Sequence, residues 1–191
     1  MLLTYGHAEI EWKGVKYRLS PTFANIAKIG TPKEIIEDFK SFITTLSLSH
    51  KFNISMNVLN ACCDKELPEA LTGRMQFSER QQKFLYVEPK HGLPMINDVI
   101  ILAEHCLLHG ICGKSDSDTG KGESLEYFDA YEFMELARVH LRLSADEAGN
   151  MTMTEFVRLM DAKFPPDKSE QIDLQESNDL LAWVEDKNKV H

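Results

Sequence analysis

The sequence predicts a mainly α-helical protein that begins with a small β-hairpin. Three observations lead to this fold class: an alternating pattern around Lys13-Gly14, several amphipathic segments with the helical period, and few other strand signals. The chain has 191 residues, of which 43% are hydrophobic, enough for one substantial core. We therefore expect one mainly helical domain over residues 1–166 and an acidic tail over residues 167–191.

The N-terminal segment alternates between apolar and charged residues, as two half-buried strands do. Ile10 and Trp12 precede Lys13-Gly14, which suits a tight turn. Three apolar residues follow the turn at every second position: Val15, Tyr17 and Leu19.

A short capped helix should follow this hairpin. Ser20 is suited to the N-cap, Pro21 to the first helical position, and Gly30 to the left-handed residue that ends a helix. These three residues predict the limits of the first helix.

The next segment begins with Thr31-Pro-Lys-Glu34, the pattern of a capping box. It predicts a helix over about residues 32–48 whose apolar residues share one buried stripe. A third helix follows and should end near Lys65. The stripe of the helix expected over residues 32–48 consists of Ile35, Ile36, Phe39, Phe42, Ile43 and Leu46. The apolar residues of the third helix are Ile54, Val58, Leu59 and Cys62.

The middle of the chain holds a polar stretch over residues 74–82 and then the β-type run Phe84-Leu-Tyr-Val87. This run is either an extended arm or an edge strand. Residues 95–109 form the most apolar segment, apolar on nearly every face, and predict a central buried helix.

The last third of the domain begins with a run of small and charged residues over 114–124, which predicts a mobile loop. A long amphipathic helix should follow from Tyr127 to Leu141. Another should begin at Thr152 or Thr154 and end at Phe164, before a double proline.

The net charge of −9 argues against a protein that binds DNA or RNA, because such proteins neutralise phosphates with basic groups. The N-terminus lacks the pattern of a secretory signal, and no apolar run reaches the length of a membrane span. We expect a soluble cytoplasmic protein whose four cysteines, Cys62, Cys63, Cys106 and Cys112, are reduced thiols.

One cluster has the residue types of a metal site. His105 and His109 lie four residues apart on one helical face, and Cys106 and Cys112 are nearby, off that face. A zinc module or small metal-dependent enzyme centred on His105, His109 and Cys112 is therefore an alternative, with His7 and His91 as remote ligands. Buried thiols and structural histidines are the competing interpretation.

Other motifs fail on spacing. Asp116 and Asp118 resemble the start of a calcium loop, but Lys121 occupies the position that requires glycine. The glycines between residues 113 and 122 lack the spacing of a phosphate-binding loop. Cys62-Cys63 lacks a neighbouring base that would make it a redox or nucleophilic pair.

The tail combines acidic residues with apolar ones, and two destinations stay open for it. It forms a terminal helix that docks on its own domain, or it presents an apolar face to a groove of a partner. The candidate partner-binding residues are Ile172, Leu174, Leu180, Leu181, Trp183 and Val184.

Two segments resemble one protein family. The run from Ile10 to Gly30 is similar to the start of tail assembly chaperones of long-tailed bacteriophages. Leu143-Ser-Ala-Asp-Glu-Ala148 followed by Met151-Thr-Met-Thr-Glu-Phe156 is similar to their "L-S-x-(D/E)-E … M-T-x-x-E-F" helix-turn-helix ending. Together the two segments cover about a third of the chain, and neither is a catalytic signature.

This resemblance implies a non-enzymatic assembly factor that needs no cofactor. It would bind the tape measure protein, keep it soluble, and help to recruit tail tube subunits. It would act in the host cell cytoplasm and be absent from the mature virion. Self-association is left open.

A DNA-binding regulator that uses residues 143–164 is a third hypothesis. Its second helix carries only two basic residues, Arg158 and Lys163, against the acidic residues Glu155 and Asp161. This helix is therefore a poor surface for binding phosphates.

Overall fold

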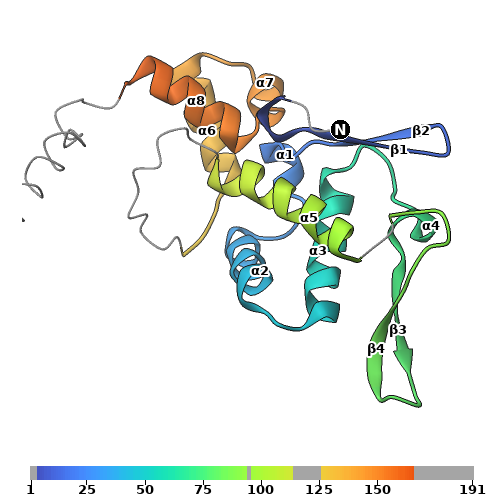
Figure 1. Cartoon of the computed structure of the whole chain (residues 1–191). Helices are drawn as coiled ribbons and strands as arrows, with labels where there is room; N and C mark the ends of the chain where they lie inside the picture. The colour runs from blue at the N-terminus through green and yellow to red at the C-terminus, as the bar shows by residue number, and fades with distance from the viewer. Residues whose placement is uncertain (1–3, 94–95, 114–125, 166–191) are drawn as a thin grey trace, which may run out of the picture. The chain divides into compact units, whose positions relative to one another are not determined.

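The computed structural model describes residues 4–93, 96–113 and 126–165 (Figure 1). The chain divides into two compact units, Met1–Leu159 and Met160–His191, and residues 160–165 of the second unit are described. The described residues are mainly helical and include an N-terminal β-hairpin, so the predicted fold class is confirmed. The predicted boundary at residue 166 stays a prediction, and the predicted loop over 114–124 lies outside the described residues.

The N-terminal hairpin has the predicted strands. A short 3-10 turn, η1 (Thr4–Gly6), precedes β1 (Ala8–Trp12), which pairs antiparallel with β2 (Val15–Leu19). Lys13 and Gly14 form the turn with φ angles of 50° and 76°. Both positive angles are what a two-residue hairpin turn requires.

Ser20 does not cap the first helix, so this prediction is wrong. Its N–H donates to the carbonyl of Cys62 at 2.9 Å, and its hydroxyl is hydrogen-bonded to Nδ1 of His7 at 3.1 Å. Thr22 caps α1 (Phe23–Ile26) instead, and its side chain accepts a helix N–H. Bonds to distant parts of the chain occupy Ser20, and no local pattern reveals such bonds.

Pro21 and Gly30 also do not mark the ends of α1. Pro21 precedes the cap residue Thr22, and α1 ends with Ala27 in a right-handed conformation. Gly30 has no positive φ angle. The first helix is therefore shorter than the predicted segment at both ends.

Helix α2 (Pro32–Thr44) begins with the predicted capping box. The Thr31 N–H donates to Oε2 of Glu34 at 2.8 Å, and the Glu34 N–H donates to the Thr31 hydroxyl. The helix ends four residues before the predicted limit. Leu46, expected in the buried stripe, therefore lies beyond the helix and is 101% exposed, and Ile43, in the last turn of the helix, is also exposed, at 61%. The buried members of the stripe are Ile35, Ile36 and Phe42.

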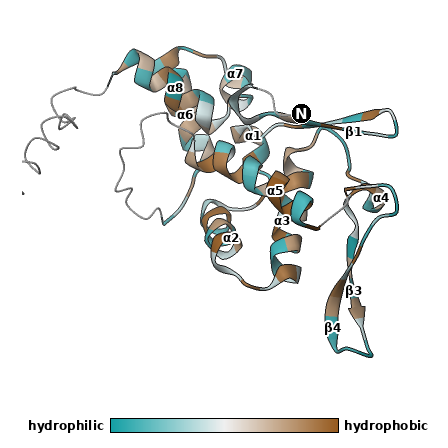
Figure 2. Cartoon of the chain, in the orientation of Figure 1, coloured by the Kyte–Doolittle hydropathy of each residue, from teal (hydrophilic) through white to brown (hydrophobic). Residues whose placement is uncertain are grey.

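Helices α3 (Leu48–Cys62) and α5 (Ile96–Leu107) pack against each other. A five-residue π-helix, η2 (Leu108–Cys112), follows α5. Although α5 is mostly hydrophobic (Figure 2), it is not buried all round, because Ile101 is 59% exposed. The prediction of a fully buried central helix is therefore wrong on this side. In the described residues, no helix is long and apolar enough to cross a membrane.

A second hairpin follows the short helix α4 (Glu69–Thr72). Strand β3 (Arg74–Ser78) pairs antiparallel with β4 (Lys83–Val87). The run at residues 84–87 is thus a strand, one of the two predicted alternatives. The stretch over 74–82, predicted only as polar, supplies its partner.

The C-terminal helices are α6 (Ala130–Leu141), α7 (Ala145–Gly149) and α8 (Met153–Lys163). Helix α6 starts three residues later than predicted, and Tyr127 is 56% exposed. Helix α8 begins as predicted, because the Thr152 hydroxyl accepts the N–H of Glu155 at 3.2 Å.

The core of the first unit includes an aromatic cluster between α1, α6 and α8. Phe23 lies 5.8 Å from Phe133 and 5.9 Å from Phe156, measured between ring centroids. Phe128 stacks on Phe133 at 5.2 Å. Phe23 is fully buried, so it joins elements that are more than 100 residues apart in the sequence.

We expect Phe23→Ala to lower the free energy of unfolding by about 3–5 kcal/mol, because it leaves a cavity among packed rings. Tyr131→Ala removes an aromatic side chain that is 65% exposed. This substitution should change the free energy of unfolding by less than about 0.5 kcal/mol. Urea unfolding followed by circular dichroism measures both. Equal effects of the two substitutions would contradict the role assigned to the cluster.

Candidate functional site

The two segments that carry the chaperone resemblance lie side by side in the first unit. Thr22 and Thr152 form an isolated antiparallel β-bridge, and the Phe23 N–H donates to the carbonyl of Met151 at 2.9 Å. The Thr152 hydroxyl donates to the carbonyl of Tyr5 at 2.9 Å. The N-terminal segment and the start of α8 therefore form one structural element.

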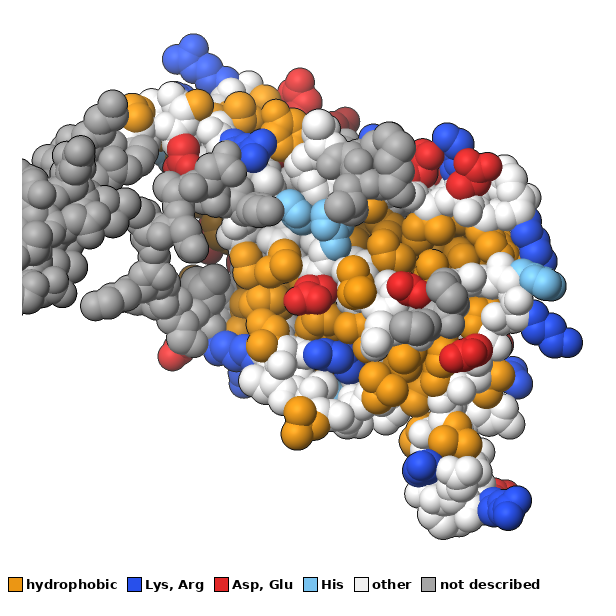
Figure 3. All heavy atoms as spheres, viewed as in Figure 1, with side chains coloured by type: hydrophobic (Ala, Val, Ile, Leu, Met, Phe, Trp, Pro, Cys, Tyr) orange, Lys and Arg blue, Asp and Glu red, His pale blue; other side chains and the backbone are white. Residues whose placement is uncertain are grey.

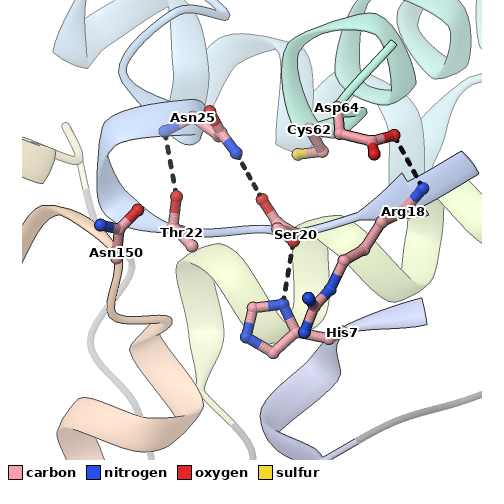
Figure 4. A pocket seen from close by; sticks show the side chains of 8 residues that line it. All are labelled: His7, Arg18, Ser20, Thr22, Asn25, Cys62, Asp64 and Asn150. Carbon is pink, nitrogen blue, oxygen red and sulfur yellow. Dashed lines mark hydrogen bonds between the residues drawn. The ribbon is translucent and has the colours of Figure 1, made fainter. Parts of the chain in front are cut away.

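A polar pocket of about 340 Å³ lies where the N-terminal hairpin meets α1 (Figure 4). Its lining comes from distant parts of the sequence: the hairpin and the turn after it, the end of α3, and the end of α7. The polar residues that matter for its chemistry are His7, Arg18, Ser20, Asn25, Asp64 and Asn150.

The side chains of His7 and Ser20 form a hydrogen-bonded pair in this pocket. Burial lowers the pKa of His7, and the positive charge of nearby Arg18 lowers it further. A serine nucleophile with a histidine base also needs a group that orients the base. Among the described residues no carboxylate hydrogen-bonds to His7, so the pair does not complete a catalytic triad.

Arg18 and Asp64 supply the charges of the pocket. The backbone N–H of Arg18 donates to Oδ1 of Asp64 at 2.9 Å, while the Arg18 side chain extends toward His7 (Figure 4). The Arg18 guanidinium makes no hydrogen bond or ion pair with any described residue. On the other wall, the Asn25 amide donates to the carbonyl of Ser20 at 2.9 Å. The pocket has the polar groups of a binding site.

The structure brings His105 and His109 together, with ring centroids 4.4 Å apart. Nε2 of His105 is hydrogen-bonded to the carbonyl of Gly6 at 2.9 Å, and Nδ1 of His109 to the Thr154 hydroxyl at 2.8 Å. The ring of His109 lies so close to Gly6, whose φ is +85°, that a Cβ there would overlap it. The histidines therefore help to hold the N-terminal segment on η2 and α8.

The remaining parts of the proposed zinc site are separate from this pair. Cys106 is buried and Cys112 is exposed. His7 is hydrogen-bonded to the Ser20 hydroxyl. In the described residues, no group of three or more His, Cys, Asp or Glu side chains is placed to hold a metal ion.

The four cysteines are free thiols, of which Cys62 and Cys106 are buried, Cys63 is partly buried and Cys112 is exposed. A hydrogen bond with Cys62, together with burial, raises the pKa of Cys106 well above its usual value. Burial also raises the pKa of Cys63. Thiols with raised pKa values are poor nucleophiles at neutral pH, so the setting of Cys63 does not favour a redox or catalytic role.

Several large apolar side chains are exposed on the first unit. On the face drawn in Figure 3, hydrophobic side chains gather around α2 and α5. The candidate residues of the tail, Ile172, Leu174, Leu180, Leu181, Trp183 and Val184, lie outside the described residues. The exposed residues around the described helices include Ile43, Leu46, Leu48, Ile101, Leu108, Tyr131 and Val139.

The model of one protein family matches residues 41–178, more than half of the chain. The chain belongs to DUF6246, a family of unknown function. No curated protein and no solved structure matches it. The DUF6246 match includes Asp64 and Asn150 of the pocket, whereas His7, Arg18, Ser20 and Asn25 precede it.

The sequence does not reveal this pocket. Its patterns suggest Ser20 as a helix cap and His7 as a remote metal ligand, and they give Arg18 no role. The alternation of the hairpin places Arg18 next to buried Tyr17 and Leu19, but nothing local shows that Asp64 and Asn150 join it.

We expect Arg18→Gln to raise the pKa of His7, because it removes the positive charge that disfavours protonation of the His7 imidazole. NMR titration of the His7 imidazole in the full chain measures this pKa. Arg74→Gln, on the second hairpin, is the matched control and should leave it unchanged. An unchanged pKa in Arg18→Gln would contradict the electrostatic contact.

The lowered pKa of His7 also fixes the direction of a pH effect on stability. The unfolded state binds a proton at His7 more readily than the folded state does. The contribution of neutral His7 to the free energy of unfolding is therefore fully present above the ordinary histidine pKa of 6.5, and it is lost as the pH falls through the pKa of His7 in the folded state. His7→Gln should remove that part of the acid dependence, measured by urea unfolding at several pH values. A His91→Gln control, at an exposed position, should retain it.

Proposed function

We propose that this protein is a non-enzymatic tail assembly chaperone of a long-tailed bacteriophage, which binds the tape measure protein and helps to recruit tail tube subunits. One observation carries the proposal. The two segments that resemble such chaperones, at opposite ends of the first unit, pack together through the Thr22–Thr152 bridge and the Phe23–Met151 hydrogen bond. Segments that form one structural element fit a common origin better than two unrelated matches.

The exposed apolar side chains support the same proposal. A chaperone for a hydrophobic helical client must present apolar surface and still stay in solution. Ile43, Leu46 and Ile101 are each more than half exposed, and the chain carries a net charge of −9. Such a surface suits transient binding of apolar helices.

The chemistry of the pocket agrees with a role other than catalysis. The His7–Ser20 pair has no orienting carboxylate in the described part of the chain, and Arg18 opposes protonation of His7. We place client binding on the apolar surfaces and on the tail segment that contains Leu180, Leu181 and Trp183. In this proposal the protein acts in the host cytoplasm and is absent from the mature virion.

Co-expression with the tape measure and tail tube proteins of the same phage tests the proposal directly. We expect affinity purification of the full chain to recover at least one of them in near-stoichiometric amount, identified by mass spectrometry. The same purification from cells that express an unrelated acidic helical protein is the control. Recovery of neither protein would contradict the proposal, and stoichiometric zinc in that preparation would support the module of His105, His109 and Cys112 instead.

The contribution of the tail has its own test. We expect replacement of Ile172, Leu174, Leu180, Leu181, Trp183 and Val184 by serine to weaken client binding at least about tenfold, because it removes a tryptophan, a residue type that often anchors interfaces, together with the apolar area around it. Replacing the polar residues Gln171, Gln175, Ser177 and Asn178 by alanine is the matched control. Undiminished binding in a chain that lacks residues 167–191 would remove the tail from the mechanism and leave the chaperone proposal intact.

A further inference from the structure

The second hairpin has two chemically different faces. The pairing of β3 and β4 sets Met75 opposite Tyr86 and Phe77 opposite Phe84, so these four side chains share one face. The other face carries Arg74, Gln76 and Ser78 of β3 and Lys83, Leu85 and Val87 of β4. The hairpin is therefore apolar on one side and mixed on the other, where both basic residues of the strands lie.

The base of the apolar face is fixed to the helical core. The ring of Tyr86 lies 5.6 Å from that of Phe52 on α3, and its hydroxyl donates to the carbonyl of Thr72 at 2.7 Å. Gly73, with a φ of 74°, lets this ring approach, because a Cβ there would come within 2.5 Å of the Tyr86 oxygen. These contacts hold the hairpin in a defined position at its base.

The outer part of the same face has no such cover. The rings of Phe77 and Phe84 pack edge to face at 5.3 Å, yet these residues are 46% and 56% exposed. An isolated two-stranded hairpin is only marginally stable in water, and a third strand would stabilise it. The aromatic pair is thus an exposed apolar surface that continues the partly buried one of Met75 and Tyr86.

Both outer edges of the hairpin are open. Apart from the ladder between β3 and β4 and the bond that the Gln81 N–H donates to the carbonyl of Ser78 in the turn at the tip, the strand residues make no backbone–backbone hydrogen bond to the described chain. Neither strand contains the proline or the bulge that proteins use to protect an edge. Because β4 is the strand in contact with α3, the outer edge of β3 is the more accessible one.

The charge of the hairpin differs in sign from that of the chain. Residues 74–87 contain three basic side chains and one acidic one, whereas the whole chain carries −9. Basic side chains are visible at the tip of the hairpin in Figure 3. Lys83 makes no ion pair with a described residue, while Arg74 lies 3.4 Å from Glu69 in an exposed pair.

We propose that the β3–β4 hairpin binds an extended, acidic segment of a partner protein, which adds as a third strand at the edge of β3. Alternate apolar side chains of this segment would cover Phe77 and Phe84, and the acidic ones between them would face Arg74 and Lys83. The open backbone edge supplies affinity, and the two faces supply specificity. This inference goes beyond the chaperone proposal and does not depend on it.

A synthetic heptapeptide of alternating valine and glutamate tests the proposal against the full-length protein. We expect fluorescence anisotropy to show saturable binding, and NMR to show slower exchange of the β3 amides. A valine–lysine peptide should bind about tenfold more weakly, because like charges replace opposite ones. A valine–glutamate peptide with alternate N-methylated amides should also lose binding, since it cannot form the ladder.

The matching protein variants remove the aromatic pair. The double substitution Phe77→Ser/Phe84→Ser should weaken binding of the valine–glutamate peptide about tenfold, since it deletes two apolar contacts. Tyr127→Ser/Tyr131→Ser, which changes two equally exposed aromatics near α6, is the control and should bind normally.

Three results would overturn the proposal. The first is no binding of the valine–glutamate peptide at millimolar concentration, and the second is binding of the lysine and N-methylated peptides as tightly as that peptide. The third is full binding of the valine–glutamate peptide by the Phe77→Ser/Phe84→Ser variant. Self-association that this variant abolishes, without peptide binding, would assign the surface to a second copy of the chain. The peptide arms leave the protein unchanged, so they stay decisive even if the double variant is destabilised.

Discussion

The structure of the first unit depends on the contact between the start of the chain and the start of α8. The Phe23 N–H binds the carbonyl of Met151, and Thr152 bridges to Thr22 and binds the carbonyl of Tyr5. Phe23 then fills the space between α6 and α8 in the aromatic cluster. These bonds join residues that are about 130 positions apart or more, and they place Asn150, at the end of α7, beside the N-terminal residues that line the polar pocket.

Features whose causes are local were predictable from the sequence. The first hairpin depends on alternation and on the turn at Lys13-Gly14, and α2 depends on the capping box of Thr31 and Glu34. Features that depend on tertiary contacts were not. Ser20 has a cap side chain, but its bonds to His7 and Cys62 leave Thr22 to cap α1. Strand β3 alternates polar and apolar residues, and this signal was overlooked because its polar side chains predominate.

The candidate sites show the same division. The spacing of His105 and His109 correctly placed both rings on one face, yet it gave no information on their partners, Gly6 and Thr154. These partners are a carbonyl and a hydroxyl from two other elements, which turn a candidate ligand pair into a packing contact. The pocket around His7 and Arg18 was not predictable, because its residues acquire their proximity only when α3 and α7 pack beside the hairpin.

The exposed apolar groups of the first unit differ in what surrounds them, and this difference separates their roles. Ile43 lies in the last turn of α2 and Leu46 follows its C-cap Thr45, so neither belongs to a strand edge, and their apolar side chains are what they offer to a partner. Phe77 lies on a strand with an open edge, where side chain and backbone are both offered. A helical client needs only the first kind of surface, whereas an extended segment needs the second. The two surfaces therefore suit two different kinds of ligand.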